Sequence, residues 1–185
     1  ATQCALQDAC GTTFHRNQLS TSVRLFDTAR REVVDFTPGN HVKMYVCGVT
    51  PYDATHLGHA FTFITYDVLI RRLMDTGRTV QCVRNVTDVD DPLFAKAREL
   101  DMHYLDLAAR EEQRLEADLQ ALNFVPMAST PRASSAIAEI RGFIRMVLER
   151  GYAYEAGGSV YFDVTRSDKF GSISHHDRVK MLELA

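Results

Sequence analysis

The sequence lacks the features that mark membrane, secreted and nucleic-acid-binding proteins. No apolar run approaches the roughly 20 residues that a membrane-spanning helix needs, and no signal peptide is visible. Basic residues are not in excess, because the formal net charge is -3, the pI is about 6.2 and no basic stripe stands out. We therefore expect a cytoplasmic protein without membrane association, and the composition does not favour binding of nucleic acid.

Cysteine is also scarce, and its spacing forms neither a disulfide framework nor a Cys-x-x-Cys pair. The four residues are Cys4, Cys10, Cys47 and Cys82. This usage is typical of a reduced compartment. The first two lie in the polar residues 1–22, which we expect to be a flexible extension, and Cys82 is expected in the core. The chain has 185 residues, 45% of them hydrophobic, enough for one core or one core with a small insertion.

Residues 44–91 have the pattern of a β-strand, an α-helix and a second β-strand. The expected order is a strand at 44–47, a turn at 48–55, a helix at about 57–76, a strand at 80–86 and an acidic loop at 87–91. The predicted apolar face of the helix consists of Phe61, Ile64, Val68, Leu69 and Leu73. The strands of a βαβ unit are parallel and end at one edge of the sheet, where ligands bind. We therefore expect Cys47, Gly48 and residues 85–87 to face one crevice.

His56, Gly58 and His59 stand at the predicted start of this helix. A helix N-terminus presents unpaired amide groups and a partial positive charge, which suit phosphate. The two histidines project to a similar side, Gly58 lets a ligand approach the backbone, and imidazoles there can stabilise charge on a transferring phosphate. The spacing alone nevertheless favours a simple pair of surface histidines, because short motifs often arise by chance.

Two longer motifs reverse that preference. Residues 47–60, CGVTPYDATHLGHA, and residues 85–91, NVTDVDD, resemble the signature of class I cysteine-activating enzymes. This group contains cysteinyl-tRNA synthetase and its paralogue, the mycothiol-pathway ligase that joins cysteine to glucosaminyl-inositol. The two motifs are separated as in these families, and the resemblance covers about residue 23 to the end of the chain.

Smaller features distinguish the two families. The segments that look like the ligase are Val49-Thr50-Pro51, Ala54-Thr55, Asp91-Pro92-Leu93, and Asp177-Arg178 followed by Met181-Leu182. Arg132, in Thr-Pro-Arg-Ala-Ser, looks more like the synthetase. The balance favours the ligase, an ATP-dependent enzyme. A synthetase that charges tRNA(Cys) remains an alternative, and so does a non-catalytic half-domain that binds adenylate or a partner chain.

The resemblance implies an α/β fold with a Rossmann-like parallel sheet, the first half of a class I aminoacyl-tRNA synthetase catalytic domain. Residues 23–100 would form this first half, and residues 101–185 would form a helical insertion, or connective region, with a small hairpin. The second half of such an enzyme carries a Lys-Met-Ser-Lys-Ser loop that binds ATP, and this sequence does not contain it. We therefore expect the 185 residues alone to be inactive, and we expect a monomer.

Other segments also carry patterns of secondary structure. The expected ranges are strands at 23–26 and 30–34, helices at 104–122 and 135–150, a loop at 124–131, and a hairpin of 152–155 and 160–164. Asp91 is expected to cap a short helix that has Pro92 at its first position. We expect the charged residues of the helix at 104–122, including Glu111, to be solvated. The apolar residues of the helix at 135–150 are expected to face inward.

The resemblance further implies a two-step reaction. ATP and L-cysteine give cysteinyl-adenylate and pyrophosphate, and an amine of glucosaminyl-inositol, or a tRNA hydroxyl, then accepts the cysteinyl group. Cys47 would bind Zn²⁺, whose preference for sulfur would select the thiolate of cysteine over serine. The remaining zinc ligands would lie outside this chain. By itself, Cys47 is most simply a small hydrophobic residue at a strand end.

The same resemblance assigns roles to individual residues. The expected catalytic residues are His56 and His59, and those expected to bind cysteine or the adenylate are Cys47, Gly48, Val49, Thr50, Gly58, Thr62, Asn85, Val86 and Thr87. Thr87 would hydrogen-bond the ammonium of cysteine, and Mg²⁺ would enter with ATP. The aspartates of the loop at 87–91 could hold Mg²⁺, although such residues are more often helix caps or surface charges. His175 and His176 are adjacent, and we expect both to be surface residues.

Overall fold

The structure is a computed structural model, and it describes residues 22–177 and 179–181. Its elements are β1 (Val23–Asp27), β2 (Glu32–Phe36), β3 (His41–Val49), α1 (Leu57–Asp75), β4 (Thr79–Val86), α2 (Asp91–Glu99), α3 (Tyr104–Ala121), η1 (Ser134–Ala136), α4 (Ile137–Glu149), β5 (Ala153–Ala156), β6 (Ser159–Phe162) and η2 (Val164–Arg166). The chain divides into two compact units, of which the first ends at Thr37 and the second begins at Pro38. The predicted extension at 1–22 falls outside the described residues except for Ser22.

β1 and β2 form an antiparallel hairpin, which is the described part of the first unit. Val23 lies opposite Phe36, and Asp27 lies opposite Glu32. The predicted strand at 23–26 is confirmed. The second strand begins two residues later than predicted, because the turn extends to Arg31, whose φ is +59°.

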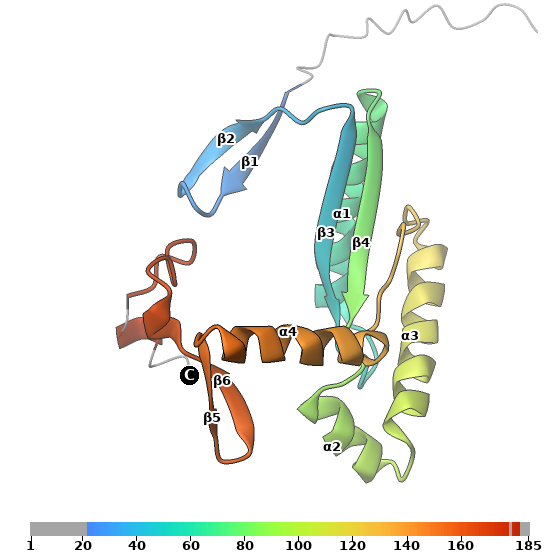
Figure 1. Cartoon of the computed structure of the whole chain (residues 1–185). Helices are drawn as coiled ribbons and strands as arrows, with labels where there is room; N and C mark the ends of the chain where they lie inside the picture. Colours follow the sequence, from blue (N-terminus) through green and yellow to red (C-terminus); the bar gives the residue numbers. More distant parts are fainter. Residues whose placement is uncertain (1–21, 178, 182–185) are drawn as a thin grey trace, which may run out of the picture. The chain divides into compact units, whose positions relative to one another are not determined.

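The second unit is built on a βαβ unit, as predicted. β3 and β4 run parallel, from His41 opposite Thr79 to Val49 opposite Val86, with an irregularity between Val46 and Val49. α1 connects the two strands and lies along one face of the pair (Figure 1). The expected α/β fold with a parallel sheet is therefore confirmed. One boundary is wrong, because β3 continues to Val49 and Gly48 belongs to the strand instead of the turn.

The core of this unit lies between the inner face of the strand pair, α1 and α3. Its buried residues are Val46, Val49, Phe63, Ile70, Cys82, Leu115 and Leu119. The predicted apolar face of α1 is right for Leu73, which is buried, but wrong for Phe61, Ile64 and Val68, which are exposed. α1 is apolar around much of its circumference, so its periodicity permits more than one face. Packing against β4 selects the face that carries Phe63.

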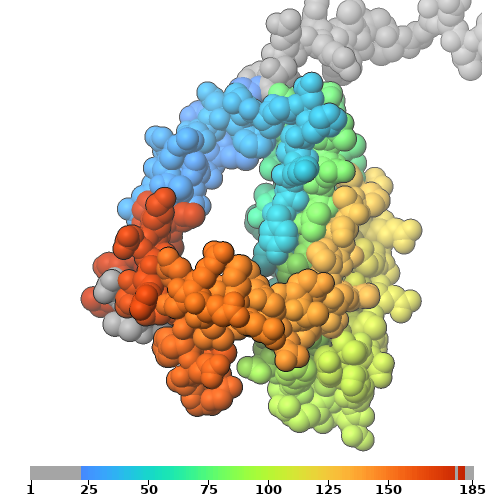
Figure 2. Space-filling model, viewed as in Figure 1, coloured from blue at the N-terminus to red at the C-terminus, as the bar shows by residue number. Residues whose placement is uncertain are grey.

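The opposite face of the strand pair is mostly polar and exposed. On β3 this face carries His41, Lys43, Tyr45 and Cys47. In Figure 2 the β3 segment is visible as a cyan strip of exposed surface. Alternate residues of a strand point to opposite faces, so the pattern that buries Val42 and Val46 places Cys47 on the exposed face.

Residues 128–133, of which the first four belong to the predicted loop at 124–131, run parallel to the outer edge of β4. The amide of Ala128 donates to the carbonyl of Cys82 at 2.8 Å, and the amide of Val86 donates to the carbonyl of Pro131 at 2.9 Å. Proline argues against a strand because it cannot donate a hydrogen bond, but its carbonyl still accepts one. β4 is therefore bonded on both edges, whereas β3 pairs only with β4 within the described ranges.

α2 and α3 pack against each other on one side of the unit. Their shared buried residues are Leu93, Ala97, Leu107 and Ala108. The predicted cap of α2 is wrong by one residue. Asp90 is the N-cap, with an extended backbone (φ -161°), and its carboxylate accepts a hydrogen bond from the amide of Asp91, which is already helical. Pro92 accordingly occupies the second helical position instead of the first.

Two further predictions about helix faces are wrong. Glu111 is buried, because its carboxylate pairs with Arg110 at 2.8 Å and with Arg114 at 3.0 Å and these ion pairs replace solvent. α4 has no buried residue, and Ile140 and Phe143 on its apolar side are exposed, since the described part of α4 contacts mainly η1 and β5. The hairpin of β5 and β6 is confirmed.

Candidate active site

The ends of β3 and β4 are in very close contact at Gly48. A Cβ atom at this position would lie 1.5 Å from the carbonyl oxygen of Asn85, so only glycine fits. The amide of Gly48 donates to Asn85 Oδ1 at 2.8 Å, and the amide of Thr87 donates to the carbonyl of Val49 at 2.9 Å. The two predicted segments, at 47–50 and 85–87, therefore meet at one edge of the strand pair.

Tyr45 extends this network, although the sequence analysis did not select it. Its hydroxyl donates to the same Asn85 Oδ1 at 2.8 Å, and Asn85 Nδ2 donates to Thr87 Oγ1 at 3.1 Å. The only local signal for Tyr45 is its outward position on β3. Its partner lies 40 residues away in the chain, so the contact depends on the strand register.

His56 and His59 cap the N-terminus of α1 reciprocally. His56 Nδ1 accepts a hydrogen bond from the amide of Gly58 at 3.0 Å, and His59 Nδ1 accepts one from the amide of His56 at 3.3 Å. The ring centroids are 4.1 Å apart. A Cβ atom on Gly58 would lie 2.8 Å from the His56 ring, so the missing side chain makes room for this cap.

The cap also determines which nitrogen of each histidine carries hydrogen. Because each Nδ1 accepts a hydrogen bond, each neutral ring has its hydrogen on Nε2. Burial, together with the neighbouring His56 imidazole, lowers the pKa of His59 below its ordinary value. The site therefore offers two Nε2–H donors at the positive end of a helix, an arrangement suited to phosphate oxygens.

The acidic loop connects the strand ends to the following elements. Thr50 Oγ1 donates to Asp90 Oδ2 at 2.9 Å, which joins the loop after β3 to the cap of α2. Asp88 is buried and accepts hydrogen bonds from both the amide and the hydroxyl of Ser134. Asp88 and Asp90 are therefore already engaged in holding the backbone.

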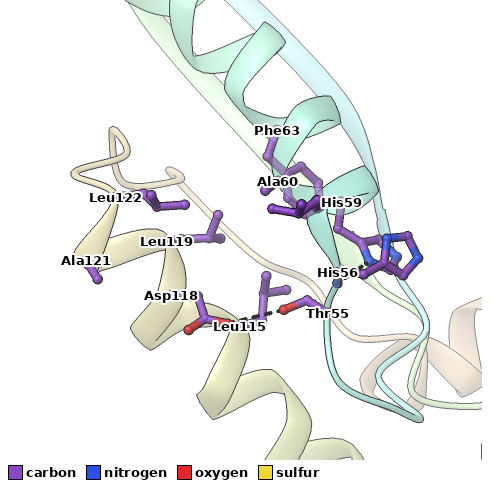
Figure 3. Close-up of a pocket in the computed structure, with 11 residues that line it drawn as sticks. Thr55, His56, His59, Ala60, Phe63, Leu115, Asp118, Leu119, Ala121 and Leu122 are labelled. Atoms are coloured by element: carbon purple, nitrogen blue, oxygen red, sulfur yellow. Dashed lines mark hydrogen bonds between the residues drawn. The ribbon is translucent and has the colours of Figure 1, made fainter.

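A cavity of about 560 Å³ lies between α1 and α3. Its lining residues are Thr55, His56, Leu57, His59, Ala60, Phe63, Leu115, Asp118, Leu119, Ala121 and Leu122. Figure 3 shows apolar residues of α3 facing α1, whereas the imidazoles of His56 and His59 lie at the margin and point away from α3. Of the predicted site residues, only these two histidines line the cavity.

The other predicted site residues differ in their surroundings. Val49 and Val86 have buried side chains in the core. The amide of Val86 is bonded to Pro131, and its carbonyl accepts a hydrogen bond from the amide of Ala133 at 3.0 Å. The Thr62 hydroxyl donates to the carbonyl of Gly58 at 3.1 Å, within α1.

Cys47 is exposed and Cys82 is buried, as the strand alternation requires. Burial raises the pKa of the Cys82 thiol. No group of three or more His, Cys, Asp or Glu side chains within 22–177 and 179–181 could hold a metal ion. His176 is exposed and His175 is half-buried. The described residues thus supply one exposed thiol but not the donor set of a zinc site, which normally has three or four protein ligands.

Arg84 is a second residue that sequence reasoning missed. It lies on the inner face of β4 and is buried, its guanidinium pairs with Glu116, and it lies 5.0 Å from the ring centroid of Phe63. A charged residue in a predicted strand would suggest an outward side chain, but the ion pair and the aromatic ring compensate the burial.

Among the described residues, no helix combines the length and the apolar composition that a membrane span requires.

The chain is similar to proteins of one enzyme group. The family model described as "tRNA synthetases class I (C) catalytic domain" matches residues 33–184. Two similar curated proteins carry the name "L-cysteine:1D-myo-inositol 2-amino-2-deoxy-alpha-D-glucopyranoside ligase". The protein from Acidothermus cellulolyticus is 43% identical over 169 residues, covering 91% of this chain and 41% of the relative. The protein from Mycolicibacterium smegmatis is 45% identical over 167 residues, covering 88% and 40%.

The chain spans about 40% of the length of these curated relatives. Among solved structures, one from Campylobacter jejuni, provisionally assigned as an arginyl tRNA synthetase, gives a TM-score of 0.45 at 13% identity. The alignment covers 78% of this chain and 46% of the Campylobacter jejuni chain. The family match covers most of the sequence. The chain therefore belongs to the family of class I (C) tRNA synthetase catalytic domains.

Proposed function

We propose that this protein activates L-cysteine with ATP and transfers the cysteinyl group to the amine of a glucosaminyl-inositol. The names of the relatives, which are 40 to 45% identical, support this substrate pair. The observation that carries the proposal is the pair of imidazoles at the start of α1, whose Nδ1 atoms are both used in the cap. This arrangement leaves both Nε2–H groups available for the phosphates of ATP.

In the first step, the carboxylate of cysteine attacks the α-phosphorus of ATP and pyrophosphate leaves. Negative charge grows on the phosphate oxygens, and donors placed in advance stabilise it. His56 and His59 would supply these donors through Nε2, together with the positive end of α1. The lowered pKa of His59 favours its neutral ring, so the ring would act as a hydrogen-bond donor instead of a fixed cation.

In the second step, the acceptor amine attacks the carbonyl carbon of the adenylate, and AMP leaves. The strand ends at Gly48 and Thr87 would hold the amino-acid part of the adenylate, because they lie at the edge where parallel sheets bind ligands. A tRNA hydroxyl is the alternative acceptor, which Arg132 and the family match favour. Mg²⁺ would accompany the ATP phosphates.

We also propose that Cys47 supplies one ligand of a Zn²⁺ ion, with the other ligands outside the described residues. Its exposed thiol fits this role better than a buried one would. Zinc would bind the thiolate of cysteine and discriminate against serine. Metal analysis of the full-length protein should show about one zinc per chain, a Cys47→Ala variant should lose it, and a Cys82→Ala variant should retain it. Stoichiometric zinc in Cys47→Ala would contradict the proposal that Cys47 is a zinc ligand.

We further propose that the part of the relatives not spanned by this chain covers two exposed features of the second unit. The first is the apolar stripe of α1 formed by Leu57, Phe61 and Val68, each more than half exposed. The second is the edge of β3 opposite β4, which pairs with no described strand. Large exposed apolar residues in one stripe indicate a surface that another segment or partner covers.

The test of the main proposal is ATP–pyrophosphate exchange by the full-length protein with cysteine, serine or no amino acid. We expect exchange only with cysteine. Product analysis with glucosaminyl-inositol or tRNA(Cys) then identifies the acceptor. Transfer to tRNA alone would replace the proposed acceptor by the alternative, and an absence of exchange would refute activation of cysteine and support a non-catalytic domain.

A matched pair of variants tests the histidine donors. His56→Asn retains a side chain that can cap α1 but removes Nε2, and asparagine is among the best N-cap residues. We expect kcat/KM for exchange to fall by about 10²-fold or more, as for loss of one donor to developing charge. The control is His103→Asn, because His103 caps α3 through the same kind of bond, Leu105 N to Nδ1 at 3.3 Å. It should leave exchange unchanged.

A further inference from the structure

The hydrogen-bond chain that begins at Tyr45 has a defined direction. Asn85 Oδ1 accepts two hydrogen bonds, one from the Tyr45 hydroxyl and one from the Gly48 amide, each at 2.8 Å. An amide oxygen has two lone pairs, so both are used. The side-chain amide is thereby oriented with its oxygen toward β3 and its nitrogen toward Thr87, to which it donates at 3.1 Å.

The orientation of the Asn85 side chain determines how the Thr87 hydroxyl is bonded. Its oxygen accepts from Asn85, so its hydrogen is directed elsewhere, and no described residue accepts that hydrogen in the structure. Thr87 is half-buried, and its amide is fixed to Val49 at the edge of the strand pair. A half-buried hydroxyl held in this way presents a donor to an oxygen atom of a ligand.

We propose that Tyr45 is a positioning residue for substrate binding. Through Asn85 it holds the Thr87 hydroxyl with its hydrogen directed at a carboxylate or carbonyl oxygen of the bound amino acid. This inference rests on the proposed function. It adds an oxygen partner for Thr87 to the predicted ammonium, because an ammonium group has no lone pair to accept that hydrogen but can still donate to the second lone pair of the Thr87 oxygen. Tyr45 itself is exposed on the outer face of β3 and contacts no substrate in this scheme.

The first experiment compares Tyr45→Phe with wild type in cysteine-dependent ATP–pyrophosphate exchange by the full-length protein. Tyr45→Phe removes one hydrogen bond and keeps the ring. We expect KM for cysteine to rise about three- to tenfold with little change in kcat, the range for one hydrogen bond. The control is Tyr161→Phe on β6, which should leave KM unchanged. An unchanged KM in Tyr45→Phe would refute the inference.

A double-mutant cycle separates positioning from a merely structural role. In a Thr87→Val background the hydroxyl is absent, so adding Tyr45→Phe should have no further effect on KM. In a Thr87→Ser background the hydroxyl is retained, and Tyr45→Phe should again raise KM severalfold. The same rise in both backgrounds would show that Tyr45 does not act through Thr87 and would overturn the inference.

A third measurement does not depend on activity. Hydrogen exchange of the Gly48 amide reports the bond to Asn85 Oδ1, and Tyr45→Phe should accelerate it severalfold while Tyr161→Phe should not. Unchanged exchange at Gly48 would refute the network. If Tyr45→Phe accelerates hydrogen exchange at Gly48 but the wild-type protein shows no cysteine-dependent pyrophosphate exchange, the network is supported and the proposed function is refuted, and with it the assignment of Thr87 to cysteine.

Discussion

The contact between Gly48 and Asn85 makes a quantitative prediction for Gly48→Ala. The added Cβ would lie 1.5 Å from the Asn85 carbonyl oxygen and 2.6 Å from its carbonyl carbon. Both are backbone atoms of β4, so no side chain can rotate away, and one strand end must move by roughly 1.5 Å or more. That movement also breaks the bond from the Gly48 amide to Asn85 Oδ1.

The expected loss of stability follows from these two effects. Overpacking costs about 1–3 kcal/mol, and the lost hydrogen bond costs about 1 kcal/mol. We therefore expect the free energy of unfolding to fall by about 2–4 kcal/mol. For a chain of this size the melting temperature should fall by about 5–15 °C. Urea titration followed by circular dichroism, with linear extrapolation, measures the change.

Two other glycines provide controls with different expected signs. No atom lies within 4 Å of a Cβ placed on Gly39 or Gly142, and neither has a positive φ. Gly39→Ala should be nearly neutral. Gly142→Ala lies inside α4 and should stabilise the protein by about 0.5–1 kcal/mol. A Gly48→Ala variant within about 0.5 kcal/mol of wild type would refute the strand contact, since that lies well below the expected cost.

Three further predictions test other parts of the structure. Because the pKa of His59 is lowered in the fold, the unfolded chain binds this proton more readily, so the free energy of unfolding should decrease as pH falls below about 6.5. Urea titrations at several pH values should show a weaker decrease in His59→Asn. An identical pH dependence in the variant would contradict the lowered pKa of His59. Asp90→Ala should destabilise the protein by about 1 kcal/mol, as loss of an N-cap does, and Asp91→Ala should destabilise it clearly less. Thermal melts that give the reverse order would identify Asp91 as the N-cap. Finally, residues 1–185 alone should show no cysteine-dependent pyrophosphate exchange, and robust exchange by them would show that the part of the relatives not spanned by this chain is not required.

Local patterns were sufficient to predict the βαβ unit and the start of α1. The alternation of apolar and polar residues in β3 and the turn-forming residues before His56 involve neighbours within a few residues. Such local patterns can therefore be recognised in the sequence without knowledge of the tertiary fold. The hairpin around Gly157 and Gly158 is of the same kind, since its turn needs two residues with positive φ and glycine adopts them easily. The resemblance to cysteine-activating enzymes likewise rests on contiguous motifs.

Other features depend on partners that are distant in the sequence. Sequence patterns mispredict the buried face of α1, because periodicity cannot choose between two apolar faces. They also miss the burial of Glu111, which depends on ion pairs, and the alignment of residues 128–133 with β4. Tyr45 and Asn85 are 40 residues apart, and their hydrogen bond exists only in the observed strand register. The sequence alone thus determined the types of the elements and the family, whereas tertiary packing decided which faces are buried and which polar groups meet at the strand ends, since those choices depend on the geometry between elements.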